Sequence, residues 1–314
     1  IVVADTVTTQ DFSLVQRLAF DPSPVHVTLD WQTTDALPAK LQNFMDVPYD
    51  LLFWEQPGDF QPAVASVGPT ALGDFTARAA SPVPLTCVAS DPDTGYVYAQ
   101  ANWGTAFYRY DPLADTWTRL ADSPLHSGNN GGAQVLDGRV YTVYTGNPSQ
   151  IGVYDIAGGT WSVMANGLGQ GTGNIATDGQ FLYLVASQNF QRYDPGAGSW
   201  TPLSAPPFSF FPWGGLDALA GTIYGHQGNG FTAFARYDIA SDSWTALAPV
   251  LGGAVLGSAI DPAARVYYAY GSYYGSNWYA FDLDTETWSL STIPFFAVDD
   301  GGLAHVGQPG VSGI

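Results

Sequence analysis

The stretch Tyr110-Asp111-Pro112-Leu113-Ala114-Asp115-Thr116-Trp117 contains the pattern from which the fold can be predicted: an aromatic residue, an aspartate and, six positions after the aspartate, a tryptophan. The pattern returns along the 314-residue chain in the stretches that end at Trp161, Trp200, Trp244 and Trp288. Successive tryptophans are 44, 39, 44 and 44 residues apart. A period of this length with an aromatic signature is typical of a propeller or a solenoid array.

Each repeat predicts four short β-strands, which in the clearest copy are Leu85–Ser90, Tyr96–Ala101, Phe107–Asp111 and Thr116–Ala121. Small residues gather around the first strand of each unit, and only small side chains let several backbones meet near a propeller axis. The tryptophan opens each last strand, where a large ring can fill the wedge between diverging blades. We therefore predict an all-β fold, a β-propeller of four-stranded blades.

The two ends of the repeat region each resemble part of a blade. A first strand starts within Gly301–Val306, shortly before the chain ends at Ile314. The strands that this unit lacks match three segments near the N-terminus, with Phe75 in the tryptophan position: Leu51–Trp54, Ala63–Val67 and Phe75–Ala80. Joining the two partial units would close the ring and remove both open sheet edges. We predict six blades, one of them composite, with seven as the alternative.

Residues 1–45 lie outside the repeat, so the predicted organisation is an N-terminal extended arm or accessory β segment, 1–45, and a propeller, 46–314. An apolar strand such as Ile1–Val3 should not stay unpaired. We expect the arm to dock on the body of the protein or on a neighbouring copy.

The charge of the chain excludes some classes of partner. The net charge is −19, and of 28 acidic residues only Glu55 and Glu286 are not aspartate. Aspartate, together with 36 Gly and 22 Pro, indicates many tight turns and little helix. A chain this negative repels phosphate backbones and anionic headgroups, so we expect no nucleic-acid partner. The chain contains no run of about 20 apolar residues, so we predict no membrane insertion.

The single cysteine, Cys87, permits neither an intramolecular disulfide nor a cysteine-based metal cage. We expect it to be a small buried apolar residue on a strand.

The Tyr-Asp-Pro…Trp pattern at the end of four-stranded units resembles the kelch repeat, over about residues 80–307. Kelch repeats usually carry a Gly-Gly pair at the end of the second strand, and this chain has other residues there, such as Ala101-Asn102. The resemblance implies a propeller fold. It leaves function open, because kelch-type propellers include binding modules, copper-radical oxidases similar to galactose oxidase, and sialic-acid epimerases.

The chain lacks the residue patterns expected of both enzyme classes, the copper-radical oxidases and the sialic-acid epimerases. The oxidases pair a cysteine with a tyrosine and bind copper through a Tyr-His pair and a further histidine. This chain has Cys87, but its histidines are isolated and none follows a tyrosine: His26, His126, His226 and His305. An epimerase-like site would need Arg, Glu and His together, whereas three arginines recur just before the repeat aromatic and are expected to be structural: Arg109, Arg192 and Arg236. We predict no cofactor and no metal.

Catalytic motifs are also lacking, and the close carboxylate pairs are few: Asp91/Asp93, Asp282/Asp284 and Asp299/Asp300. Hairpin turns account for the first pair, and calcium would need several more oxygen ligands at any of them. The repeated Tyr-Asp is expected to be structural, with the aspartate capping the turn after it. We predict no catalytic residue.

The candidate ligand site lies in the loops that break the repeat. In a propeller, the loops between strands two and three and those between blades open on one face. There the chain places the predicted ligand-binding residues Asn102, Trp103, Asn129, Asn130, Phe210, Trp213, His226, Tyr273, Tyr274, Asp299 and Asp300. Aromatic rings stack on sugar faces and Asn or Asp bonds hydroxyl pairs, but tyrosine and tryptophan also mark protein interfaces. Packing of any one of these aromatics into the core is the competing interpretation.

Three functions remain open. The leading hypothesis is a non-catalytic extracellular or particle-surface propeller that recognises a neutral glycan or a protein. The alternative is a structural subunit of an extracellular filament, surface layer or virion appendage, assembled from copies of itself through residues 1–45. A carbohydrate-active enzyme is the third, and it would require a carboxylate pair facing a pocket.

Overall fold

In the computed structural model of this chain, the structure describes residues 8–10, 27–29, 78–127, 132–143, 150–168, 174–252, 257–272, 275–292, 304–308 and 311–313. The chain divides into two units, Ile1–Gly68 and Pro69–Ile314. In the first unit, β1 (Thr8–Gln10) pairs antiparallel with β2 (Val27–Leu29). Residues 46–68 lie outside the described part, so the predicted domain boundary after residue 45 stays a prediction.

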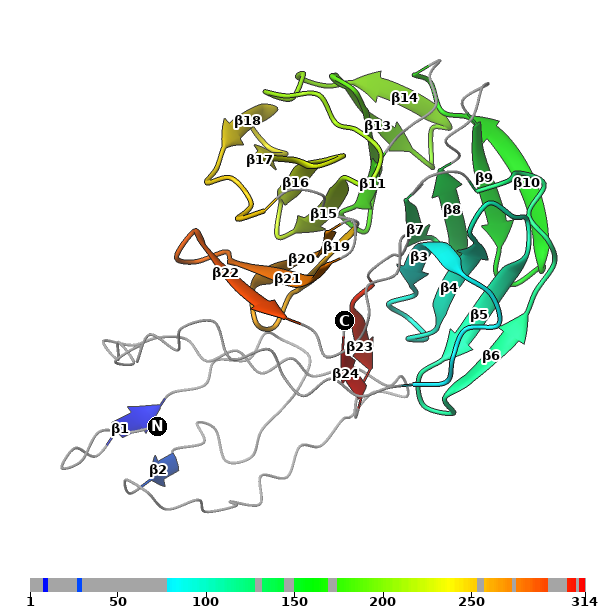
Figure 1. Ribbon diagram of the computed structural model, residues 1–314, viewed down its shortest axis with the longest axis horizontal. Coiled ribbons are helices and arrows are strands. Elements are labelled where there is room, and N and C mark those ends of the chain that lie inside the picture. Colours follow the sequence, from blue (N-terminus) through cyan, green and yellow to red (C-terminus); the bar gives the residue numbers. More distant parts are fainter. Residues whose placement is uncertain are drawn as a thin grey trace. The chain divides into compact units, whose positions relative to one another are not determined.

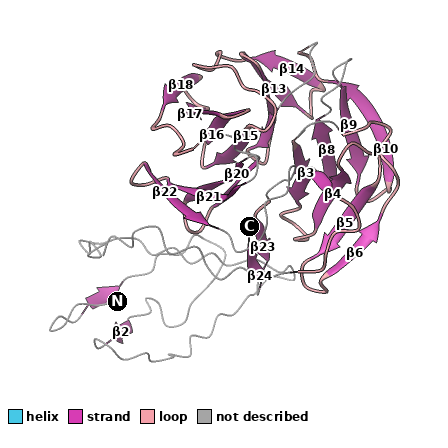
Figure 2. Cartoon of the chain, viewed as in Figure 1, coloured by secondary structure: helices cyan, strands magenta, loops and turns pink. Residues whose placement is uncertain are grey.

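The second unit contains five four-stranded antiparallel sheets, the blades of a β-propeller (Figures 1 and 2). Within the described residues there is no helix. The strands, blade by blade, are β3 (Leu85–Ser90), β4 (Val97–Ala101), β5 (Phe107–Asp111), β6 (Thr116–Arg119); β7 (Ala133–Leu136), β8 (Arg139–Val143), β9 (Gln150–Asp155), β10 (Thr160–Ala165); β11 (Asn174–Thr177), β12 (Leu182–Ala186), β13 (Asn189–Asp194), β14 (Ser199–Pro202); β15 (Gly215–Leu219), β16 (Thr222–Gly228), β17 (Phe231–Asp238), β18 (Ser243–Ala246); and β19 (Gly257–Asp261), β20 (Val266–Ser272), β21 (Gly275–Asp282), β22 (Thr287–Thr292). The all-β propeller predicted from the repeat is confirmed.

The first strand of each blade lies innermost. Each of β3, β7, β11 and β15 contacts the first strand of the next blade, so the blades follow one another in chain order around a common axis. Small residues make this approach possible: a Cβ atom on Gly132 would lie 2.8 Å from Ile175 Cγ2, and one on Gly215 would lie 2.0 Å from Ser258 Oγ. These contacts explain the small residues that the sequence gathers at the first strands.

The core consists of apolar clusters between neighbouring blades. The cluster between blades 1 and 2 joins Cys87, Tyr98, Phe107, Val140 and Tyr154. Cys87 is buried on β3, as predicted. Burial raises the pKa of its thiol to about 12. The thiol is therefore protonated at neutral pH.

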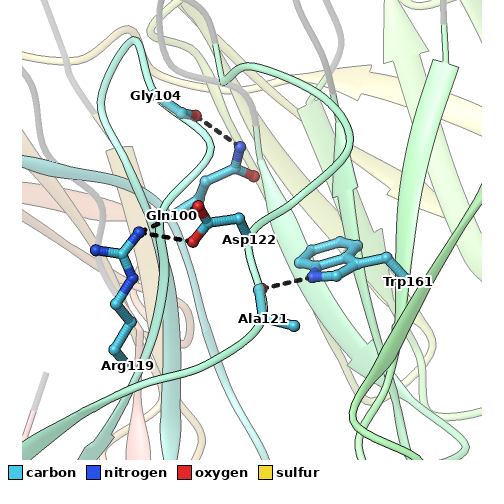
Figure 3. Close-up of polar contacts among 6 residues, drawn as sticks. All are labelled: Gln100, Gly104, Arg119, Ala121, Asp122 and Trp161. Atoms are coloured by element: carbon cyan, nitrogen blue, oxygen red, sulfur yellow. Dashed lines mark hydrogen bonds and ion pairs between the residues drawn. The ribbon is translucent and has the colours of Figure 1, made fainter.

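The signature tryptophans link each blade to the one before it. In every blade the indole Nε1–H donates to a backbone carbonyl of the preceding segment, over 2.8 to 3.2 Å (Figure 3 shows the pair Trp161 and Ala121). The donor and acceptor pairs are Trp117 to Ala79, Trp161 to Ala121, Trp200 to Ala165, Trp244 to Ser204 and Trp288 to Ala248. From the second blade on, the acceptor lies four residues after the preceding tryptophan, so the spacing between blades is held by one repeated contact.

Ala79, which precedes the first blade, makes the same two hydrogen bonds that link later blades to one another. Ala79 accepts from Trp117 and donates its N–H to Asp115 Oδ1 at 2.8 Å, just as Ser204 accepts from Trp244 and donates to Asp242 at 2.9 Å. Ala79 is four residues after Phe75, which matches the predicted tryptophan position.

The closing blade itself falls mostly on residues outside the described part. Its predicted segments near residues 51–77 and 301–303 are not described, so the count of six stays a prediction beside the five blades observed. Near the C-terminus, β23 (Val306–Gln308) pairs with β24 (Val311–Gly313) as a two-stranded sheet. His305 Nε2 lies 3.8 Å from Asp261 Oδ1 of blade 5.

The repeat aspartates cap the turns that follow them, as predicted. Asp194 Oδ1, for example, accepts the N–H groups of Gly196 and Ala197 at 2.8 and 3.0 Å, and the aspartates of the other blades accept in the same way. The recurrent arginines lie against neighbours on the sheets: Arg109 and Arg192 each stack 4.3 Å from a ring centroid, and Arg236 pairs with Glu286.

Candidate functional site

The two ends of the propeller differ in charge. In each antiparallel blade the turns between strands one and two and between three and four lie at one end, here called the turn face. The loops between strands two and three and the connections between blades lie at the other end, here called the loop face. Of the acidic residues that the structure describes, all but Asp122 and Asp217 lie in turn-face hairpins or at the strand ends that border them. Among the described residues, the negative charge is therefore concentrated away from the loop face.

Trp103, in the loop between β4 and β5, is an exposed tryptophan of the loop face. Its ring is 62% exposed, and its φ of 53° is in the left-handed region. The Gly104 N–H closes the turn on the Ala101 carbonyl at 3.1 Å. A non-glycine residue in this region is uncommon, so the surroundings must hold it there.

Gln100 provides that support from below. Its buried side-chain amide donates to the carbonyls of Gly104 and Leu125, at 2.9 and 2.7 Å (Figure 3 shows the bond to Gly104). Ser127 adds two more ties, since its N–H donates to the Gly104 carbonyl at 3.1 Å and its hydroxyl donates to the Ala101 carbonyl. The backbone under Trp103 is thus fixed while its ring faces solvent.

A second tryptophan turn lies in the connection between blades 3 and 4. The Gly214 N–H donates to the Phe211 carbonyl at 3.2 Å, Pro212 is the second residue of the turn, and Trp213 has a φ of 64°. This is the φ pattern of a type II turn, whose third position ordinarily holds glycine. The Phe211 N–H donates to the Gln227 carbonyl at 2.9 Å and ties the turn to β16.

An exposed apolar patch lies beside the second turn. The rings of Phe211 and Phe231 stack with centroids 5.3 Å apart and planes 24° apart, and Phe231 is 47% exposed. The Val250 N–H donates to the Thr232 carbonyl at 2.8 Å, which ties the connection after blade 4 to β17, one residue from Phe231. Leu251 is 58% exposed.

Asn229 and Gly230 connect β16 to β17 at the edge of this patch. Both have positive φ, 52° and 80°, and Gly228 pairs with Phe231 across them. This is a two-residue type I′ hairpin of the Asn-Gly kind, whose geometry sets Phe231 at the start of β17.

A buried polar network lies beneath the second tryptophan turn. His226 is fully buried, with Nδ1 2.6 Å from the Tyr267 hydroxyl and Nε2 3.3 Å from the Trp213 carbonyl. Burial, and secondarily the charge of Asp217, raises the pKa of Tyr267 well above its ordinary value. His226 therefore joins the Trp213 turn to blade 5 as a structural group.

Asp217 is a partly buried carboxyl on the innermost strand β15, where Ser258 Oγ of β19 donates to its Oδ2. Burial raises the pKa of Asp217 from 3.8 to about 6, and the Ser258 bond opposes this. A folded-state pKa above the unfolded value means that the fold favours the protonated form. The stability that this carboxyl contributes is present below about pH 4 and is lost as the pH rises to about 6.

We expect Asp217→Asn to remove this pH dependence. The variant should gain stability relative to the wild type between pH 4 and pH 7, by on the order of 2 kcal/mol. Urea denaturation of both proteins at the two pH values measures the difference. If the stabilities of the two proteins change equally between pH 4 and pH 7, Asp217 is solvated well enough to keep an ordinary pKa.

The predicted site residues fall into three groups: residues of the loop face, residues buried in the core, and residues outside the described part. Trp103 is exposed on the loop face, and Asn102 and Trp213 belong to the two tryptophan turns. Phe210 is only 2% exposed and packs in the core between blades 3 and 4, and His226 is also buried, so neither can contact a ligand at the surface. The other six lie outside the described residues: Asn129, Asn130, Tyr273, Tyr274, Asp299 and Asp300.

The predicted set omitted Phe231 and Leu251. The sequence carried a signal for Phe231, because Asn229-Gly230 is the strongest short hairpin signal and fixes the strand that follows it. Nothing in the sequence distinguishes Leu251 from the buried Val250 beside it.

In the part of the chain that the structure describes, no three His, Cys, Asp or Glu side chains are grouped so as to hold a metal ion. None of its described segments forms a helix long and apolar enough to cross a membrane.

Comparison with known proteins supports the fold and goes no further. No known protein family and no curated protein matches the sequence. Among solved structures, YjhT aligns with 60% of this chain and 73% of its own, at 15% identity and a TM-score of 0.52. A protein of unknown function from Bacteroides thetaiotaomicron aligns with 69% of this chain and 60% of its own, at 16% identity and a TM-score of 0.52.

A third similar structure is a fungal alcohol oxidase of the AA5 family in complex with copper. It aligns with 68% of this chain and 53% of its own, at 16% identity and a TM-score of 0.50. Identities this low show a shared propeller architecture alone. The resemblance to the kelch repeat continues to rest on the sequence pattern.

Proposed function

We propose that this propeller is a non-catalytic recognition module, extracellular or at the surface of a particle, which binds a glycan or a protein through its loop face. The observation that carries the proposal is the pair of tryptophan turns. Trp103 and Trp213 both hold left-handed backbone conformations at the same end of the propeller, each followed by glycine. Hydrogen bonds hold the backbone of both turns, so that each tryptophan is fixed at this end of the propeller.

The arrangement suits binding better than turnover. The aromatics of the loop face stand on backbone fixed by Gln100, Ser127 and the β16 contacts, so little ordering cost remains to be met on binding. The described carboxylates lie almost entirely at the opposite end, where the repeat aspartates cap turns and others pair with arginines.

We expect Trp103→Ala to weaken binding of the labelled protein in a glycan array and a cell-binding assay by at least about tenfold. Its exposed ring makes few core contacts, so the thermal midpoint should change little. Leu113→Ala is the matched control, because Leu113 is 66% exposed on the turn face. Unchanged binding by Trp103→Ala and by Trp213→Ala would refute the loop face as the site.

A structural role in an assembly formed through residues 1–45 remains the second proposal. It is supported by the β1–β2 pair, a two-stranded sheet of the kind that is marginal alone and leaves strand edges available to another chain. Light scattering with and without residues 1–45 tests it, and a monomer in both cases would count against it.

A further inference from the structure

We infer that the part of the loop face around blade 4 binds a neutral polysaccharide. The inference rests on the proposed recognition function and names its ligand class. The site consists of the Phe211–Phe231 stack, Leu251, the Trp213 turn and Asn229, here called the blade-4 patch.

The blade-4 patch contains no charge in a protein of net charge −19. Residues 203–216, 226–234 and 247–252, which supply the connections and the hairpin here, include no Asp, Glu, Lys or Arg. A cationic ligand would find no carboxylate to pair with, and an anionic ligand would find no arginine or lysine while approaching an acidic molecule. The ligand that this surface suits is uncharged.

The patch combines exposed apolar side chains with uncharged hydrogen-bonding groups. The exposed ring of Phe231, stacked on Phe211, offers a shelf for the C–H face of a sugar ring, and Leu251 is a further exposed apolar side chain of these segments. Asn229 is exposed next to this shelf, and its amide can donate to one hydroxyl and accept from another. A pyranose without ionised groups presents both features at once: an apolar C–H face and a rim of hydroxyls.

A protein partner fits the same surface less well. Stable protein interfaces bury on the order of 1,600 Å² and draw on arginine together with tryptophan and tyrosine. The three segments of the patch have no arginine, and Phe231 and Leu251 are the large apolar side chains that they expose among the described residues. An aromatic shelf with a polar, uncharged edge suits a sugar ring better.

Native affinity electrophoresis tests the inference, with laminarin, galactomannan or amylopectin in the gel as neutral probes, and alginate or polygalacturonate as anionic ones. We expect retardation by at least one neutral polymer and by neither anionic one. For that polymer, the affinity measured by calorimetry should change less than about twofold between about 0.05 M and about 1 M NaCl. Phe231→Ala should weaken it by at least about tenfold, while Phe231→Tyr and Leu113→Ala should retain it.

Retardation by anionic polymers alone, or by none of the five, would overturn the ligand class. If Trp103→Ala still lowered binding to cells in that case, the recognition function would stand with a partner of another class. Neutral-polymer binding that survives Phe231→Ala would overturn the location of the site.

Discussion

Replacing Trp161 by alanine is expected to lower the free energy of unfolding by about 3 kcal/mol, the low end of the range for large aromatic truncations. Its indole ring packs edge-on against Phe107 of blade 1, with centroids 4.8 Å apart, and lies 5.2 Å from Tyr154 of its own blade. Its Nε1–H donates to the Ala121 carbonyl at 2.9 Å (Figure 3). The variant loses the ring contacts and the link between blades together.

The control variant Trp161→Phe separates these two contributions. Phenylalanine keeps an aromatic ring in the wedge and removes only the indole donor, so we expect a loss of about 1 kcal/mol. Urea denaturation followed by circular dichroism measures both variants. If alanine and phenylalanine cost the same, the hydrogen bond would be the main stabilising term and the packing of the wedge would be secondary.

The sequence predicted the tryptophan position well because its cause is local. Each tryptophan follows the repeat aspartate by six residues, a spacing set by one hairpin, and hairpins depend on their own turn residues. The carbonyl that each indole binds could not be predicted, because it lies in the previous blade, across a connection of variable length. Between Trp161 and Trp200 the repeat shortens to 39 residues, yet the acceptor Ala165 keeps its place four residues after Trp161.

The candidate site was less predictable, because neighbouring residues of a connection can point in opposite directions. Phe210 and Phe211 are adjacent, but the bridge between Ser187 and Phe210 turns the first ring into the core, and Phe211 then stacks on Phe231. The connection has no periodic pattern from which to predict which of the two rings points into the core.

His226 shows the second cause of error, an underestimated strand. The sequence analysis placed His226 in a loop of the ligand-binding face, whereas β16 continues through it to Gly228 with an irregular register. The histidine is therefore an interior strand residue rather than a loop residue, and its ring faces the core.

Gly228→Ala is expected to have the largest effect of any small substitution near the site, because two penalties coincide there. The residue has a φ of 81°, which disfavours any side chain. A Cβ atom would also lie 2.3 Å from Gly214 N and 2.6 Å from the Pro212 carbonyl oxygen, both backbone atoms of the second tryptophan turn. Backbone on both sides cannot yield as a flexible side chain would.

Gly221→Ala isolates the first penalty. Gly221 has nearly the same φ, 80°, in the hairpin turn of the same blade, and a Cβ atom there would meet nothing within 4 Å. We expect Gly221→Ala to cost about 1 kcal/mol and Gly228→Ala to cost more than about 3 kcal/mol. The Gly228 variant should also lose ligand binding, since relief of the clash must move the backbone of Trp213. Equal stabilities of the two variants would mean that the turn can shift freely, and the rigid display of Trp213 on which the proposed function depends would then be wrong.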